Sequence, residues 1–133
     1  MPQSPTCSCS SGALGTGKKV LVYACSGSAN VAEIADRAAR QLTGAGVGPM
    51  FCLAGLGAGI PNMIQTARNA DLNLVIDGCP MDCARLIFQH LGLTNVKFIR
   101  VTDHGIAKAK GVPITDEQVQ KIVALAQESL ATA

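Results

Sequence analysis

Four short, mostly apolar runs alternate with segments of helical periodicity along this chain of 133 residues. The runs are KKVLVYAC (18–25), PMFCL (49–53), LNLVID (72–77) and VKFIRV (96–101). Strands that are apolar at nearly every position are typical of a parallel sheet covered by helices on both faces. The pattern therefore predicts an α/β fold: a small, doubly wound, flavodoxin-like three-layer sandwich with a mostly parallel four-stranded sheet.

The segments between the apolar runs carry helix signals. Residues 30–43 place Val, Ile, Ala and Leu at helical spacing, and Pro61 suits the first turn of a short helix. A further helix is expected to open at Pro80, and Thr115 with Gln118 forms a capping box at the start of the last one. Strands and helices thus alternate, which favours right-handed crossovers between parallel strands.

Composition indicates one compact domain. Hydrophobic residues make up 48% of the chain and charged residues 15%, which is a globular balance. Residues 1–17 are rich in Ser, Gly and Pro, so we expect a flexible tail followed by a single domain over 18–133.

Charge and hydropathy exclude several classes of partner. The net charge of +2 is spread along the chain and aromatic residues are only 3%, which gives nucleic-acid binding little support. No apolar run approaches the roughly 18 residues of a membrane span. The polar N-terminal segment has no apolar signal-peptide core, so the cytoplasm is the expected location.

Four of the six cysteines fall at the ends of the predicted strands or just beyond them. Cys25 ends the first apolar run, Cys52 lies near the end of the second, and Cys79 follows the third by two residues. Cys83 comes four residues later, one turn into the helix expected to open at Pro80. Parallel strands end at one edge of a sheet, so we expect these thiols to meet there.

Several cysteines at one edge favour metal or redox chemistry over isolated buried thiols in a reducing compartment. A helix N-terminus favours thiolate, and Arg85, Arg100 and Lys108 are candidate counter-charges. The residues alone leave three interpretations open: a zinc site, an iron–sulfur cluster, or a thiol-disulfide or persulfide-transfer protein using Cys79 and Cys83. Whether the protein is an enzyme stays open.

Four short motifs carry a resemblance to a known family. They are ACSGSAN (24–30), CLAG (52–55), VIDGCPMDCA (75–84) and VTDHGIAK (101–108). In this order, over about residues 18–115, the sequence resembles the DGC-domain family of small prokaryotic proteins, named for an Asp-Gly-Cys motif. The resemblance implies one zinc ion held by four cysteines, which map onto Cys25, Cys52, Cys79 and Cys83. It implies no established reaction, and metal sensing or trafficking is the expected use.

The remaining candidate groups are weaker. Cys7 and Cys9 in the tail are either incidental or a mobile dithiol that captures or hands over metal. His104 in the fourth motif is interpreted as a surface loop histidine. The glycine-rich run at 55–60 lacks the third glycine of a dinucleotide fingerprint. We therefore expect no nucleotide cofactor.

Overall fold

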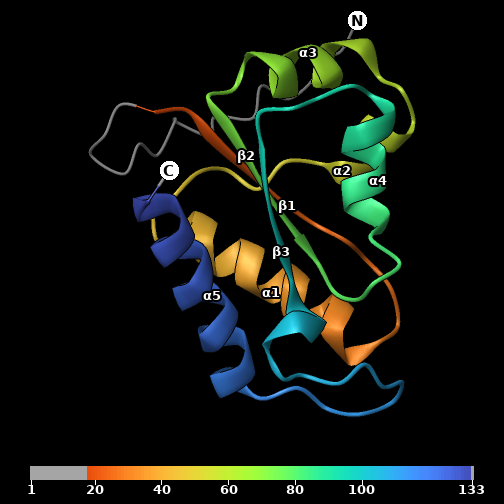
Figure 1. Ribbon diagram of the computed structural model, residues 1–133, viewed down its shortest axis with the longest axis vertical. Coiled ribbons are helices and arrows are strands. Elements are labelled where there is room, and N and C mark those ends of the chain that lie inside the picture. The colour runs from red at the N-terminus through yellow and green to blue at the C-terminus, as the bar shows by residue number, and fades with distance from the viewer. Residues whose placement is uncertain (1–17, 133) are drawn as a thin grey trace, which may run out of the picture.

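A computed structural model describes residues 18–132, and the expected tail with Cys7 and Cys9 lies outside them. Within these residues the chain forms an α/β domain with a three-stranded parallel sheet and five α-helices (Figure 1). The elements in chain order are β1 (Val20–Ala24), α1 (Asn30–Gly44), α2 (Leu53–Gly57), α3 (Pro61–Asn69), β2 (Leu72–Asp77), α4 (Cys83–His90), β3 (Val96–Arg100), the 3-10 helix η1 (Val101–His104) and α5 (Asp116–Ala131).

The sheet has the strand order β1-β2-β3, and both pairings are parallel. Val22 of β1 lies opposite Leu74 of β2, and Leu74 lies opposite Lys97 of β3. β2 is therefore central, and its residues 73–77 are all buried. Because the strands are parallel, the segments that follow β1, β2 and β3 leave the sheet at the same edge (Figure 1).

The prediction of a fourth strand was wrong. The segment 49–53 makes only an isolated parallel bridge, between Met50 and Val22. Its two hydrogen bonds run from Val22 N to Pro49 O (3.0 Å) and from Phe51 N to Val22 O (2.8 Å). α2 already begins at Leu53, so the chain turns into a helix before a ladder can extend. The flavodoxin-like layout is accordingly not confirmed.

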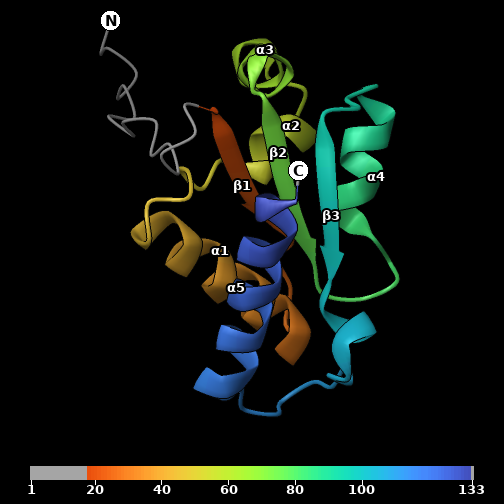
Figure 2. The ribbon, with the colours of Figure 1, turned by 60° about the vertical axis from the view of Figure 1, so that its left-hand side comes forward.

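Helices cover both faces of the sheet, as predicted. One buried cluster joins α1 and α5 to one face, with Val22, Ile34 and Ile122 among its members. The other joins α2, α3 and α4 to the opposite face around Tyr23 and Phe88, whose rings meet edge to face at 4.9 Å (Figure 2). The first cluster is entirely aliphatic, so packing there rests on branched side chains and alanines.

The predicted helix boundaries hold where local signals are strong. α1 begins at Asn30 as expected. The capping box of α5 is formed, because Gln118 N donates to Thr115 Oγ1 (3.2 Å) and Thr115 N donates to Gln118 Oε1 (3.0 Å). None of the helices within residues 18–132 combines the length and apolarity that a bilayer crossing requires.

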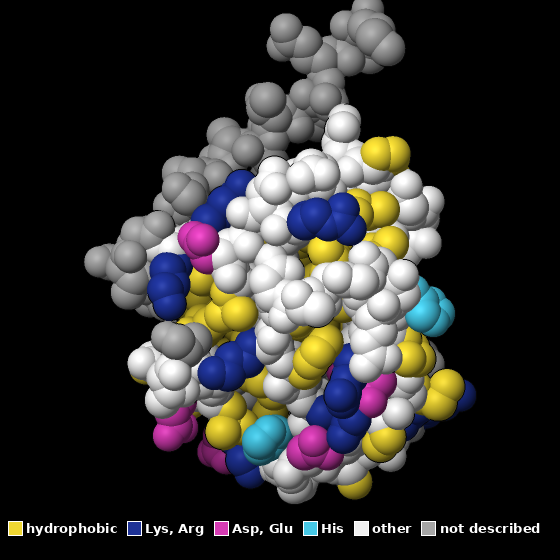
Figure 3. Space-filling view, turned by 45° about the horizontal axis from the view of Figure 1, so that its top comes forward, with side chains coloured by type: hydrophobic (Ala, Val, Ile, Leu, Met, Phe, Trp, Pro, Cys, Tyr) yellow, Lys and Arg dark blue, Asp and Glu magenta, His cyan; other side chains and the backbone are white. Residues whose placement is uncertain are grey.

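On the face shown in Figure 3, basic and acidic side chains are interspersed, in keeping with the small net charge.

Candidate metal site

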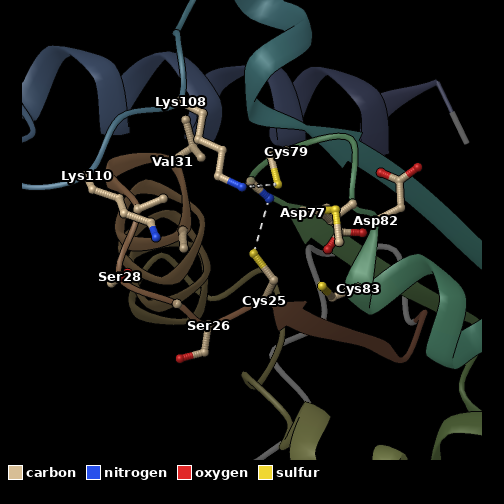
Figure 4. Close-up of a pocket in the computed structure, with 15 residues that line it drawn as sticks. Cys25, Ser26, Ser28, Val31, Asp77, Cys79, Asp82, Cys83, Lys108 and Lys110 are labelled. Carbon is tan, nitrogen blue, oxygen red and sulfur yellow. Dashed lines mark hydrogen bonds between the residues drawn. The ribbon is translucent and has the colours of Figure 1, made fainter.

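A pocket of about 160 Å³ opens at the carboxyl edge of the sheet, beside the ends of β1 and β2. Cys25, directly after β1, lines it together with Cys79 and Cys83. The three side chains are directed toward one common space (Figure 4). All three are free thiols, and Cys25 and Cys79 are half-buried whereas Cys83 is exposed. Three thiols from two separate segments, the end of β1 and the turn between β2 and α4, therefore converge on one pocket.

Cys52, the fourth predicted ligand, is not among the residues that line this pocket. It is exposed and forms the N-cap position of α2. Within residues 18–132, no three Cys, His, Asp or Glu side chains are grouped closely enough to hold a metal ion. The structure thus brings three of the four predicted cysteines to one pocket and leaves Cys52 outside it.

α4 begins at Cys83, not at Pro80 as predicted. Asp82 precedes it in a left-handed backbone conformation (φ 52°), and Asp82 N donates to Cys79 O (3.1 Å). Cys79 and Cys83 therefore lie at the two ends of a turn, and the expected helical i, i+4 spacing does not apply.

The side chain of Asp77 explains the late start of α4. This carboxylate at the end of β2 is buried and accepts hydrogen bonds from Ala84 N and Arg85 N, both at 2.9 Å. Burial raises the pKa of Asp77, and the two hydrogen bonds act against that rise. Asp77 caps the first free amides of the helix from the strand end. Asp77 thereby fixes the start of α4 relative to the end of β2.

Gly78 is required by close packing against α1. A Cβ at this position would lie 2.9 Å from Val31 C and 3.0 Å from Ala32 N, which are backbone atoms of the first turn of α1. Gly78 N also donates to Cys25 Sγ (3.1 Å). The glycine therefore allows three segments to meet: the end of β2, the start of α1 and the thiol of Cys25.

The thiol of Cys25 is partly shielded from solvent. Burial raises the pKa of Cys25 to about 11, and the hydrogen bond from Gly78 N counteracts part of this rise. The value of about 11 already includes smaller contributions from the nearby acidic groups of Asp77, Cys83 and Cys79, which also raise the pKa. Ionisation of Cys25 is therefore helped by a positive charge in the pocket, which a bound metal cation would supply.

A basic loop borders the same pocket. Lys108 and Lys110 are among the lining residues, and Lys108 Nζ donates to Cys79 Sγ (3.4 Å). Arg85 instead lies over the ring of Phe98, 5.1 Å from its centroid. Of the predicted counter-charges, Lys108 is thus the one that contacts a cysteine sulfur within the described residues.

Sequence reasoning missed Asn30, which holds the basic loop in place. This buried side chain donates from Nδ2 to Ala107 O (2.9 Å) and accepts at Oδ1 from Ala109 N (2.7 Å). Asn30 N also donates to Ala109 O (2.9 Å). The only signal in the sequence is an asparagine at the start of a helix. Its partners lie almost eighty residues further along the chain, so sequence proximity could not reveal them.

Arg100, at the end of β3, reaches the turn between the two cysteines. Its Nε donates to Asp82 Oδ1 (2.8 Å) and its Nη2 to Asp82 Oδ2 (2.5 Å). Its Nη1 also lies 3.2 Å from Asp103 Oδ2. The paired guanidinium lowers the pKa of Asp82, and the two carboxylates raise the pKa of Arg100. His104 donates no side-chain hydrogen bond in this region and does not line the pocket.

The sequence matches the DGC domain over residues 21–125, which is most of the chain and includes all four predicted ligands. The protein belongs to the DGC domain family. One curated relative in this family is the "Anaerobic and virulence modulator AnvM" of Pseudomonas aeruginosa. It is 31% identical over 102 residues, which cover 77% of this chain and 78% of the relative. No solved structure matches the chain.

Proposed function

We propose that this DGC-domain protein binds one thiophilic metal ion, zinc in the first instance, through cysteine thiolates at the carboxyl edge of its sheet. The observation that carries the proposal is the convergence of Cys25, Cys79 and Cys83, all free thiols, on one pocket. Sulfur donors suit zinc and other soft metals better than they suit magnesium or calcium.

The donor set fits zinc in its chemistry, and the surrounding charges favour it. Four thiolates and a zinc dication carry two net negative charges, and the ammonium group of Lys108 beside Cys79 would offset one of them. Cys52 is the proposed fourth ligand. It follows Phe51, which is hydrogen-bonded to β1, so it starts near the same edge, and its exposed side chain is free to turn.

A site filled by four sulfur ligands favours sensing or carrying metal over hydrolysis. Tetrahedral zinc with four thiolates has no open position for a reactive water. The relative AnvM is named as an anaerobic and virulence modulator. Exposed thiols are open to oxidation, and oxidation of Cys83 would remove a ligand. We therefore extend a regulatory role to this chain, in a reducing compartment such as the cytoplasm.

Thiol exchange is the second candidate function, and one observation favours it. Cys79 and Cys83 lie at the two ends of a single turn, and Lys108 places a positive charge beside Cys79. In this candidate Cys79 is the nucleophile and Cys83 the resolving thiol, with a disulfide or a persulfide as the exchanged group.

Zinc titration of the reduced protein tests the proposal against this alternative. We expect one zinc per chain in competition with a chromophoric chelator, and slow alkylation of Cys25, Cys79 and Cys83 until a strong chelator removes the metal. Absence of binding, with rapid formation of a Cys79–Cys83 disulfide under a mild oxidant, would instead establish the thiol-exchange function.

A further inference from the structure

We propose that Arg100 is a positioning residue for the metal site: it sets the geometry of Cys79 and Cys83 by clamping Asp82 between them. This inference rests on the proposed function. Arg100 does not line the pocket and touches no cysteine in the described contacts. Its action on the site is therefore indirect, through the backbone of the turn.

The turn between the two cysteines holds an unfavourable conformation. Asp82 is the one non-glycine residue with positive φ in the described part of the chain. Aspartate adopts the left-handed region more readily than most residues, but the conformation still costs free energy, which contacts to its side chain offset. Met81, just before it, is 67% exposed and gives little packing support.

Arg100 supplies the missing support from a different strand. Nε and Nη2 of Arg100 donate two parallel hydrogen bonds, one to each carboxylate oxygen of Asp82. The side chains of Arg100 and Asp82 are only 26% and 18% exposed, so solvent competes weakly for this pair. Asp103 holds Nη1 from the other side, which keeps the guanidinium plane in place.

The Arg100–Asp82 pair acts on both cysteines, because Asp82 is hydrogen-bonded to Cys79 and covalently joined to Cys83. Its amide N–H donates to Cys79 O, and its peptide bond leads directly to Cys83, the first residue of α4. Asp77 secures the helix only from Ala84 onward. The turn that separates Cys79 from Cys83 is thus held in place by the Arg100–Asp82 pair. Arg100 is the last residue of β3, so the pair connects this turn to the sheet.

Arg100→Lys tests the inference, since lysine keeps the positive charge but cannot form the paired hydrogen bonds of the guanidinium. Zinc affinity should fall by at least about 10-fold, the scale seen for residues that orient metal ligands. In the zinc-free variant, amide hydrogen exchange should speed up across residues 79–83. With cobalt(II) as a probe, the thiolate-to-metal absorption should change in intensity. Arg37→Lys, which alters an exposed ion pair with Glu33 on α1, is the matched control and should change none of these.

Asp82→Asn provides a second variant, because asparagine tolerates the left-handed conformation while losing the charge. If Arg100 and Asp82 act as a unit, the variant that carries both Arg100→Lys and Asp82→Asn should have the same zinc affinity as the single variant with the lower affinity. Wild-type-like zinc affinity and cobalt spectrum in Arg100→Lys would overturn the inference and leave the metal site standing. A loss of affinity that merely follows the folded fraction, measured by urea titration, would overturn it as well. Failure of the wild type to bind zinc or cobalt would overturn both proposals.

Discussion

Replacement of Cys25 by serine is expected to weaken zinc binding by about 100-fold or more. Sulfur-rich zinc sites contribute roughly 10–16 kcal/mol of apparent binding free energy, so one of four ligands accounts for about 3 kcal/mol. The Cys25 thiol is half-buried, and its Sγ already accepts a hydrogen bond from Gly78 N at 3.1 Å. The affinity is measured by competition with a chelator of known zinc affinity.

Cys52→Ser is the matched comparison for this experiment. Cys52 is exposed and does not line the pocket, so its loss is expected to cost less zinc affinity than the loss of Cys25. Unchanged affinity in Cys25→Ser, with a correctly folded variant, would contradict the assignment of the pocket as the metal site. Equal losses in both variants would show that Cys52 joins the site as fully as Cys25.

Gly78→Ala is expected to lower the free energy of unfolding by about 1–3 kcal/mol, the usual cost of overpacking. The added Cβ would lie 2.9 Å from Val31 C and 3.0 Å from Val31 O. These are backbone atoms in the first turn of α1, so relief requires movement of the helix relative to β2. Urea denaturation of the zinc-free protein measures the change.

Gly44→Ala is the control for the glycine experiment. Gly44 is the last residue of α1, and no neighbouring atom lies within 4 Å of a Cβ built there. Its free energy of unfolding should stay the same or rise slightly, since alanine is the better helix former. Gly78→Ala as stable as Gly44→Ala would mean that the contact between α1 and the Asp-Gly-Cys turn is looser than described.

The sequence predicted the elements whose signals are local. Residues 72–77 are mostly apolar and lie between Asp71 and Gly78, and they form β2 with the predicted limits. The capping box at Thr115 lies within four residues and was equally legible. By contrast, the apolar pattern of PMFCL (49–53) is equally compatible with a strand and with an extended segment that leads into a helix. The early start of α2 at Leu53 decided between them, and no residue in the run signals it.

The sequence predicted those site residues whose positions follow directly from the ends of the strands. The end of β1 and the end of β2 placed Cys25 and Cys79 at one edge, as the apolar pattern indicated. The start of α4 was not predictable from Pro80, because the capping carboxylate comes from β2 and the left-handed Asp82 is held by Arg100, eighteen residues away. Such contacts follow from the tertiary fold, and local preferences do not reveal them.

Metal content of the protein purified without oxygen and without added metal tests the central claim most directly. Elemental mass spectrometry, with protein concentration from amino-acid analysis, should give one zinc per chain, and the visible spectrum should be featureless. If the analysis finds iron with acid-labile sulfide and the protein is brown, the same thiols hold an iron–sulfur cluster and the assignment of zinc is wrong. Absence of any metal, in protein whose thiols are all reduced, would contradict the metal-site account.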